Sequence, residues 1–429
     1  MEFSENAKKK VYTYRWGIFA ILVTAYFFVY FQRMAVGIVG EDIVEDVGGS
    51  IGILSAVYFW TYTAMQIPSG LLADHLGPQK ASFIFLLLAT LGSFITFIGT
   101  EFWMIVLGKI LIAAGMAVVY IPLMKIISVW FKKTDFPQLT GIVIAVGNVG
   151  AIAASAPLEL LSNAIGWREV FFVLGLVTFT LAILCLIIVR DHPHKKGLPS
   201  IEEIEKAEKG TPIDDKTDAK LPMLTGLKMV ATSGRKFWTL ALAYFLVYGS
   251  IMVFQGTWAK TYFNHTYDFA FSVVWFITMI GIGKILSSII IGILNGRGII
   301  RSKRRAMSIG TLLFACIWGI IWIFAGEMNN YWFWMIICFL FGFFGGFMTL
   351  SFTQVKEWFP TAISGTTVSA MNLFLFLGAS ICTTITGIII GTTYSIENFT
   401  LVWVLMFALS ILALILVLLS VEKPSESNT

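Results

Sequence analysis

Residues 70–80 read Gly-Leu-Leu-Ala-Asp-His-Leu-Gly-Pro-Gln-Lys. They form a short polar interruption between two long apolar runs. The run before it covers residues 50–73, and the run after it covers residues 81–99. Each has the length of about 20 residues that a helix needs to cross a bilayer. The stretch therefore predicts a tight turn between two membrane-spanning helices.

The composition of the whole chain agrees with this. Of the 429 residues, 57% are hydrophobic and 13% are charged, whereas soluble domains are about 45–50% apolar and about 25% charged. A water-soluble globular chain is therefore excluded. The net charge of +5 is too small to indicate nucleic-acid binding. All four cysteines lie in apolar segments without paired spacing, so no disulfide framework, metal site or cofactor is expected.

Apolar runs of this length recur along the chain and predict an all-α membrane protein with twelve spanning helices. Six runs lie before the long polar stretch in the middle of the chain and six lie after it. The resulting domains are a tail at 1–14, a six-helix bundle at 15–190, a linker at 191–236, a second bundle at 237–421 and a tail at 422–429. The runs cover residues 15–40, 50–73, 81–99, 102–131, 137–161, 169–189, 237–262, 270–294, 306–326, 331–357, 362–391 and 399–420. Within the linker, Ser200 and Glu203 form a capping-box pattern that can begin a short helix.

Lysine and arginine concentrate in alternate loops, which predicts the orientation of the chain. If the N-terminus is cytoplasmic, the cytoplasmic loops hold Lys8–Lys10, Lys80, the linker and the basic run 297–305. The opposite loops hold mainly acids. We therefore expect a multi-pass protein of the cytoplasmic membrane with both termini inside.

The two halves repeat short patterns in the same order, which predicts an internal duplication. Residues 25–30 match 243–248, and residues 55–60 match 272–277. Trp130 and Phe131 match Trp358 and Phe359, and Gly141 and Asn148 match Gly365 and Asn372. Duplicated six-helix halves are typical of alternating-access carriers.

The loop at 70–80 resembles the signature G-x-x-x-D-R-x-G-R-[RK] of the major facilitator superfamily. Gly70, Asp74, Gly77 and Lys80 match it, and His75 and Gln79 replace arginines. Gly70 is expected to allow close helix approach and Gly77 a tight turn. Asp74 is expected to face the positive end of the helix that begins near residues 361–364 and so to latch the cytoplasmic side shut. The alternative is that the loop only sets the topology.

Two further motifs resemble parts of this superfamily. Lys109, with Ala113 and Gly115, resembles the pattern R-x-x-x-G-x-G, and we expect Lys109 to have a structural role, bonded to a neighbouring backbone group or acid. Tyr30-Phe31-Gln32-Arg33 resembles organic-anion carriers, in which the arginine binds the phosphate or carboxylate of the substrate. Ile251 occupies the repeat position of Arg33, so a symmetric arginine pair is absent.

Cationic and polar side chains within the apolar runs are the candidate substrate-binding residues, because such groups usually face a cavity or a partner. Arg33 shares a helix face with Tyr26 and Tyr30, although it could instead reach the interface or pair with an outer acid. Whether Lys125 and Lys284 face a cavity is left open. The remaining candidates are Tyr58, Tyr62, Gln66, Asn148, Tyr248, Gln255, Trp258 and Asn372. Their alternative role is hydrogen bonding between helices.

The surplus of embedded cations predicts a transporter of a small organic anion, most simply a carboxylate. The alternatives are a polyspecific exporter of lipophilic compounds and a carrier of neutral or zwitterionic nutrients such as amino acids. No catalytic motif is evident, so an enzyme is not expected. The expected partners are an anionic substrate, the lipid bilayer and a coupling ion, either a proton or an exchanged anion, and the protein is expected to be a monomer.

Overall fold

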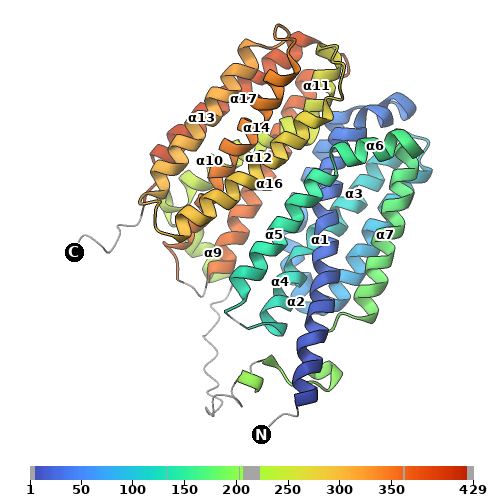
Figure 1. The fold of residues 1–429 in the computed structure, drawn as a ribbon, viewed down its shortest axis with the longest axis vertical. Coiled ribbons are helices and arrows are strands. Elements are labelled where there is room, and N and C mark those ends of the chain that lie inside the picture. The colour runs from blue at the N-terminus through green and yellow to red at the C-terminus, as the bar shows by residue number, and fades with distance from the viewer. Residues whose placement is uncertain (1–4, 133, 202, 206–222, 361–362, 423–429) are drawn as a thin grey trace. The chain divides into compact units, whose positions relative to one another are not determined.

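In the computed structural model (Figure 1), the described residues are 5–132, 134–201, 203–205, 223–360 and 363–422. They form helices, with no strand among them. The helices of the first half are α1 (Glu5–Val47), α2 (Ile51–Ile98), α3 (Phe102–Val118), α4 (Tyr120–Trp130), α5 (Phe136–Ala153), α6 (Ala156–Ile165) and α7 (Trp167–Ile187). Those that follow are η1 (Pro193–Lys196), α9 (Met223–Ala231), η2 (Gly234–Lys236), α10 (Trp238–Val253), η3 (Phe254–Trp258), α11 (Ala259–Thr266), α12 (Val274–Gly296), α13 (Lys303–Ile323), α14 (Tyr331–Gly345), η4 (Gly346–Thr349), α15 (Leu350–Lys356), α16 (Ser364–Ile390) and α17 (Ile396–Leu418).

The lengths of these helices are consistent with the twelve predicted spans. In the described chain, ten helices are long and apolar enough to cross a membrane. An eleventh span arises if the pair Gln138–Ala153 and Ala156–Ile165, bent by 44°, is counted as one. The remaining predicted span, 50–73, forms the first part of α2. Tyr58, Tyr62 and Gln66 make it less apolar than the others.

The predicted tight turn at 70–80 is present as a sharp break within α2. Gly77 has φ 77° and ψ 158°, while the residues on either side continue in helical geometry. A positive φ costs glycine little because glycine has no Cβ. Pro78 follows, and its fixed φ suits the first turn of the next helix.

The helix α1 is longer than its predicted span, 15–40, at both ends. Residues 5–14, predicted as a tail, are helical, and the helix continues to Val47. Val11 packs there against Ile201 and Ile204 of the linker. The predicted capping box is confirmed. The Ser200 backbone N–H donates to Glu203 Oε2 at 2.8 Å, and the Glu203 N–H donates to Ser200 Oγ at 3.2 Å.

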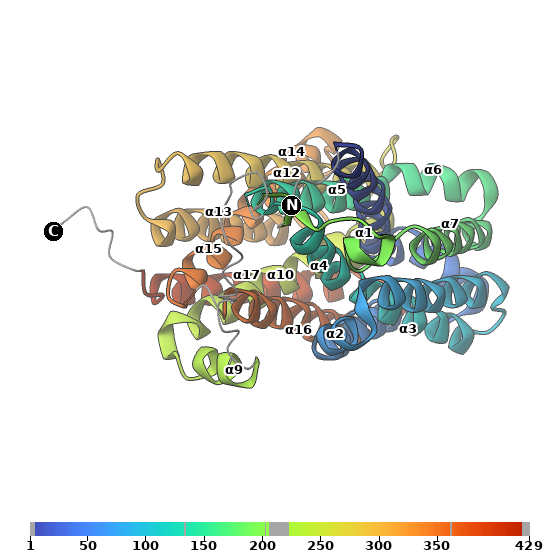
Figure 2. The same cartoon turned by 90° about the horizontal axis from the view of Figure 1, so that it is seen from below.

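The contacts between Cα atoms divide the chain into two compact units. Unit 1 comprises Met1–Arg33, Ala64–Ala154 and Leu160–Lys216, and unit 2 comprises Met34–Thr63, Ser155–Glu159 and Thr217–Thr429. Within unit 2, α12 packs on α14, α10 on α16 and α13 on α17, and Figure 2 shows α12 and α14 side by side. The end of α1, the start of α2 and the start of α6 thus pack with the second half of the sequence.

Equivalent corners in the two halves show the pseudo-symmetry directly. The Trp130 indole N–H donates to the carbonyl of Arg190 at 2.9 Å, and the Trp358 indole N–H donates to the carbonyl of Val421 at 3.0 Å. The residue after each carbonyl is an acid, Asp191 or Glu422, that accepts a hydrogen bond from the first turn of another helix. The two six-helix repeats are therefore built alike at this corner.

The close helix crossings correct the predicted register of the repeat. A Cβ at Gly150 would lie 2.2 Å from the carbonyl oxygen of Phe27, and a Cβ at Gly378 would lie 2.2 Å from that of Phe245. Phe27 and Phe245 occupy the same position in the predicted repeat. The spacing from Gly150 to Gly378 equals that from Trp130 to Trp358. The predicted pairing of Asn148 with Asn372 was therefore wrong by about one helical turn. In the corrected register, the counterpart of Asn148 is Phe376.

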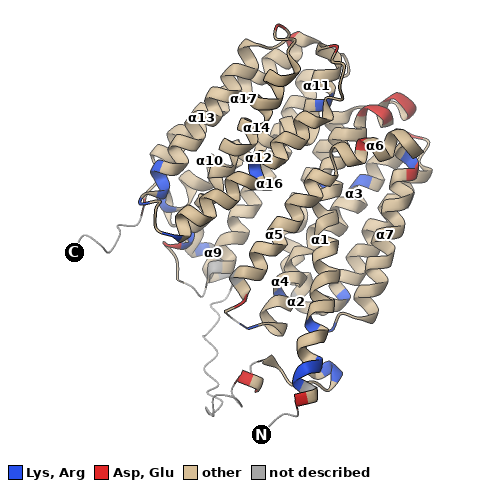
Figure 3. Ribbon diagram, viewed as in Figure 1, with Lys and Arg blue, Asp and Glu red and all other residues tan. Residues whose placement is uncertain are grey.

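Charged residues gather near the helix ends of each unit (Figure 3). In unit 2, one end carries the basic start of α13, with Lys303, Arg304 and Arg305. The other end, called the distal end of unit 2 below, carries Glu41, Glu159 and Lys260 and the residues packed around them.

Candidate functional site

Arg33 lies on a shelf of tyrosines inside unit 1. Its residue is only 4% exposed, and its guanidinium carbon lies 4.4 Å from the centroid of the Tyr30 ring. The Tyr30 and Tyr26 rings are 5.3 Å apart, and Tyr26 lies 5.4 Å from Tyr120 of α4. The stack predicted on one face of α1 is therefore present, and Tyr120 extends it onto a second helix.

The shelf is held in place by a small residue on α5. A Cβ at Gly147 would lie 3.0 Å from ring atoms of both Tyr26 and Tyr30, so any larger side chain would push the rings away. Asn148, the next residue, is half-buried. The spacing of residues on α1 predicted the shelf, whereas nothing in the sequence of α4 distinguished Tyr120 from the other large side chains there.

A second aromatic cluster lies in unit 2. Tyr58 and Tyr62 of α2 stack at 6.2 Å, and Tyr62 lies 4.3 Å from Phe376 of α16. Phe376 also contacts Tyr248 of α10 at 5.9 Å. The Lys284 ammonium lies 5.4 Å from the centroid of the Tyr248 ring, so Lys284 points toward this cluster. Phe376 was missed because the predicted register placed Asn372 at the position equivalent to Asn148.

The other candidates are more dispersed. Gln255 lies in the π-helical segment η3 and is 4% exposed. Trp258 is fully buried, and its indole N–H donates to Thr386 at 3.2 Å. This geometry places Trp258 in packing between helices. Gln66 and Asn372 are half-buried on α2 and α16.

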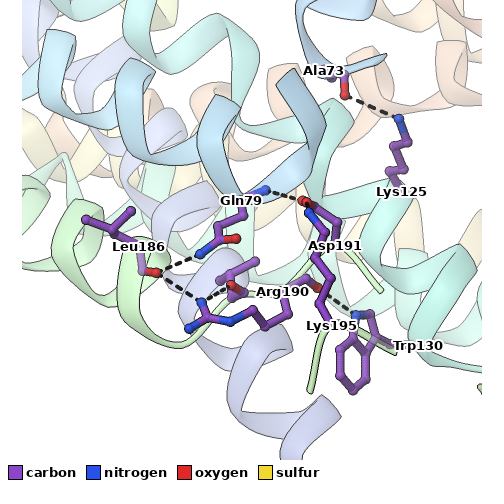
Figure 4. Close-up of polar contacts among 9 residues, drawn as sticks. Ala73, Gln79, Lys125, Trp130, Leu186, Arg190, Asp191 and Lys195 are labelled. Carbon is purple, nitrogen blue, oxygen red and sulfur yellow. Dashed lines mark hydrogen bonds and ion pairs between the residues drawn. The ribbon is translucent and has the colours of Figure 1, made fainter. Parts of the chain in front are cut away.

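Lys125 lies at the corner of unit 1 shown in Figure 4. Its ammonium donates to the carbonyl of Ala73 at 3.2 Å, near the end of the helical segment that precedes Gly77. A lysine near the C-terminal end of a helix satisfies a carbonyl and complements the helix dipole. This contact is that of an anchor at a helix end, and the prediction that Lys125 faces a cavity stays a prediction.

Asp191 organises the same corner (Figure 4). Its carboxylate accepts a hydrogen bond from the Gln79 backbone N–H at 2.8 Å and pairs with Lys195 at 2.5 Å. A Cβ at Gly77 would lie 3.0 Å from this carboxylate, so the tight turn and the acid fit together. The Gln79 amide donates to the carbonyl of Leu186 at 2.7 Å. The sequence gave no signal for Asp191.

The structure resolves the predicted gating motif only in part. Gly77 makes the expected turn and Lys80 is exposed. Gly70 does not mark a close approach, because the nearest side-chain atom to a Cβ there is 4.0 Å away. The side chain of Asp74 and residues 361–362 lie outside the described part of the chain, so the predicted latch stays a prediction.

Lys109 differs from its expected environment. It is fully buried, and its ammonium has no hydrogen-bond partner among the described residues. The ammonium lies instead 4.2 Å from the centroid of the Phe171 ring. A cation over an aromatic face is stabilised by the ring quadrupole, which here takes the place of the backbone group or acid that we expected.

The described residues contain no group of three or more His, Cys, Asp or Glu side chains that could hold a metal ion. The candidate features that the described residues provide are the tyrosine shelf under Arg33, the aromatic cluster beside Lys284 and the anchored helix corners.

The sequence as a whole is similar to sequences of proteins named as transporters. The chain is 22% identical over 366 residues to a "Probable hexose phosphate transport protein" of Chlamydia trachomatis, a match that covers 79% of this chain and 77% of that protein. It is 22% identical over 307 residues to a "Probable sulfoacetate transporter SauU" of Cupriavidus necator, with 70% of each chain covered. It is 23% identical over 414 residues to a "Probable galactarate/D-glucarate transporter GudP" of Escherichia coli, with 90% and 89% covered.

Structural comparison agrees on the fold. A bacterial homolog of the human lysosomal transporter Spinster, in an inward-facing and unoccupied conformation, superposes with a TM-score of 0.74 at 16% identity. The match covers 94% of this chain and 96% of that one. The model of the Major Facilitator Superfamily matches residues 22–302 and 273–429. Because these matches cover most of the sequence, the chain belongs to the Major Facilitator Superfamily.

Proposed function

We propose that this transporter carries a small organic anion across the membrane by alternating access and that Arg33 binds the anionic group. The observation that carries the proposal is the burial of Arg33 over Tyr30, within the span Lys8–Val47. An ionised side chain inside a bilayer costs several kcal/mol, and a binding role accounts for that cost.

The chemistry of the guanidinium favours a carboxylate as the simplest substrate. Its planar fork matches the two oxygens of a carboxylate. Stacking on Tyr30 uses the face of the guanidinium, whereas hydrogen bonds to an anion use its edge. The printed names of the relatives describe carriers of hexose phosphate, sulfoacetate and galactarate or glucarate, and these compounds are all organic anions.

The basic and acidic residues at opposite helix ends support an orientation of the chain in the membrane. We place the basic end of α13 and the corner around Asp191 in the cytoplasm, with both chain termini, and the distal end of unit 2 outside. The membrane is then the cytoplasmic membrane. We propose that the carrier is a monomer without catalytic activity and that transport is driven by a proton or by an exchanged anion.

Binding and uptake in proteoliposomes test the role of Arg33. The protein is reconstituted and assayed with D-glucarate, sulfoacetate and glucose 6-phosphate, and each is also screened by thermal shift. Arg33→Gln should weaken binding of the transported anion by about 10- to 100-fold, because a hydrogen bond to a charged group contributes roughly 1.5–3 kcal/mol. Arg33→Lys should retain part of the affinity, since it keeps the charge and loses the fork.

Arg305→Gln is the matched control, because Arg305 is an exposed cation at the start of α13. It removes the same charge from the protein and should leave affinity unchanged. If Arg33→Gln and Arg305→Gln bind all the anions equally well, Arg33 is not the anion site. Stabilisation by neutral amino acids or lipophilic cations, unaffected by Arg33→Gln, would favour the neutral-nutrient or exporter function instead.

A further inference from the structure

Lys260 is a buried cation at the distal end of unit 2. It lies on α11 within the apolar span Gly234–Thr266, and its residue is 8% exposed. The ammonium donates to the carbonyl of Ile38 on α1 at 2.7 Å and lies 3.6 Å from Glu159 Oε1 on α6. Lysine is rarely buried to this degree unless it is paired.

Glu159 is held as firmly as Lys260. Its side chain is 14% exposed, and its second oxygen, Oε2, accepts a hydrogen bond from Ser272, just before α12. Ser272 Oγ in turn accepts a hydrogen bond from the Val274 N–H at 3.2 Å. One carboxylate therefore joins α6 to both α11 and the start of α12.

Both partners of Lys260 come from the other half of the sequence. Ile38 and Glu159 belong to the first six-helix repeat, whereas Lys260 belongs to the second. Around them, helices of both repeats pack very closely. A Cβ at Gly37 would lie 2.8 Å from the Gly256 carbonyl oxygen, and one at Gly52 would lie 2.6 Å from the Gly387 Cα. The distal end is thus closed in this structure.

Several acidic side chains lie near Lys260 among the described residues at this end. Asp42 on α1 is close enough to interact electrostatically with both Lys260 and Glu159. Glu41 accepts a hydrogen bond from Asn264 at 2.9 Å and lies 3.8 Å from the His265 imidazole. Tyr331 on α14 is within electrostatic range of Glu159. Lys260 is therefore a basic group in a largely acidic environment.

Resting on the proposed function, we propose that Lys260 binds the anionic group of the substrate when the distal side opens and that Glu159 occupies that position when it closes. Lys260, Ile38 and Glu159 pack within unit 2 but belong to different repeats, so in this proposal movement of one repeat against the other separates them. The ammonium then loses a carboxylate and a carbonyl. A carboxylate, sulfonate or phosphate of the incoming anion replaces the carboxylate of Glu159 with the same chemistry.

The position of Lys260 along its helix fits this role. The π-helical segment η3, with Gln255, ends two residues before Lys260, and the Tyr248 ring beside Lys284 lies on the preceding α10. Such π-helical segments are rare and are frequently found at functional sites. Lys260 thus lies at the distal end of the helical segment that also carries the candidates Tyr248 and Gln255.

Sided transport kinetics with two neutralising substitutions test the exchange. KM for the transported anion, chosen from D-glucarate, sulfoacetate and glucose 6-phosphate, is measured from the distal side as uptake and from the other side as efflux in oriented proteoliposomes. Lys260→Gln should raise the distal KM about tenfold. Glu159→Gln should lower the distal KM by about two- to fivefold, because it removes a competing carboxylate with the strength of a modest ion pair.

The opposite signs separate this proposal from a purely structural latch. Both substitutions break the same ion pair, so a latch alone would shift the distal KM in one direction for both, and that result would overturn the proposal. The double variant Lys260→Gln/Glu159→Gln should keep the high KM of Lys260→Gln, and a return to the native value would also overturn it. Lys260→Arg should stay near native, which shows that the charge matters.

The same vesicles distinguish failure of this inference from failure of the proposed function. Arg33→Gln should raise KM on both sides, whereas Lys260→Gln should raise it on the distal side only. If Arg33→Gln has no effect while the Lys260 and Glu159 variants behave as expected, the proposed role of Arg33 fails and the exchange stands. If Lys260→Gln shifts KM equally on both sides while Arg33→Gln raises it on both, the exchange fails and the role of Arg33 stands. Melting temperatures of all variants verify that they are folded.

Discussion

Replacing glycine by alanine at two places on α5 should have opposite effects on stability. At Gly150 the added Cβ would lie 2.2 Å from the carbonyl oxygen of Phe27, far inside the ordinary contact range of 3.4–4 Å. The backbone of α1 cannot rotate away as a side chain could. The two helices must therefore separate by roughly 1 Å. At Gly141 the same Cβ has no neighbour within 4 Å.

The magnitudes follow from two terms. Overpacking a tight contact costs about 1–3 kcal/mol, and alanine is favoured over glycine inside a helix by about 0.8–1 kcal/mol. Gly141→Ala gains only the higher helix propensity of alanine and should stabilise the protein slightly. Gly150→Ala includes both terms and should be the less stable of the two by about 1–3 kcal/mol.

The assay is heat-induced loss of folded protein in detergent, followed by size-exclusion chromatography. Gly378→Ala and Gly365→Ala on α16 repeat the comparison in the second half, because the first would lie 2.2 Å from the Phe245 carbonyl oxygen and the second has open space. Equal melting temperatures for Gly150→Ala and Gly141→Ala, or a lower one for Gly141→Ala, would refute the reasoning about the helix crossing.

Two further predictions concern buried polar groups in unit 1. Asp191→Asn should lower the free energy of unfolding by about 1–3 kcal/mol, because the Gln79 N–H and the Lys195 ammonium lose a charged acceptor; an unchanged melting temperature would contradict this. Lys109→Met should leave stability unchanged or raise it, because a buried charge without a hydrogen-bond partner is replaced by an apolar chain of similar volume. A large fall in melting temperature for Lys109→Met would show that the contact with Phe171 contributes more than we expect.

The sequence predicted the spans well because each has a simple physical signature. A run of about 20 consecutive apolar residues has the length and composition of a helix that crosses a bilayer. The turn at Gly77 and the capping box at Ser200 and Glu203 were predicted correctly, since both depend on local backbone chemistry. The shelf under Arg33 followed from helical spacing on a single helix.

Contacts between distant helices could not be predicted in the same way. In a helix that is apolar all round, Tyr120 and Phe376 look like residues that face lipid, because no hydrophobic stripe separates the two sides. Lys260 was not counted among the embedded cations, since its position near the end of an apolar run is usual for a lysine that reaches the interface. Gly70 was assigned a close approach from the motif alone, and the structure leaves room there.

The paired corners at Trp130 and Trp358 show how two segments can be built alike although their sequences differ. Each indole bonds to a main-chain carbonyl, supplied by Arg190 in one half and by Val421 in the other. Every amino acid carries that carbonyl, so the position could drift from a long cation to a small aliphatic residue without losing the bond. The likeness of the two corners therefore depends on the path of the backbone, which side-chain substitutions at these positions leave unchanged.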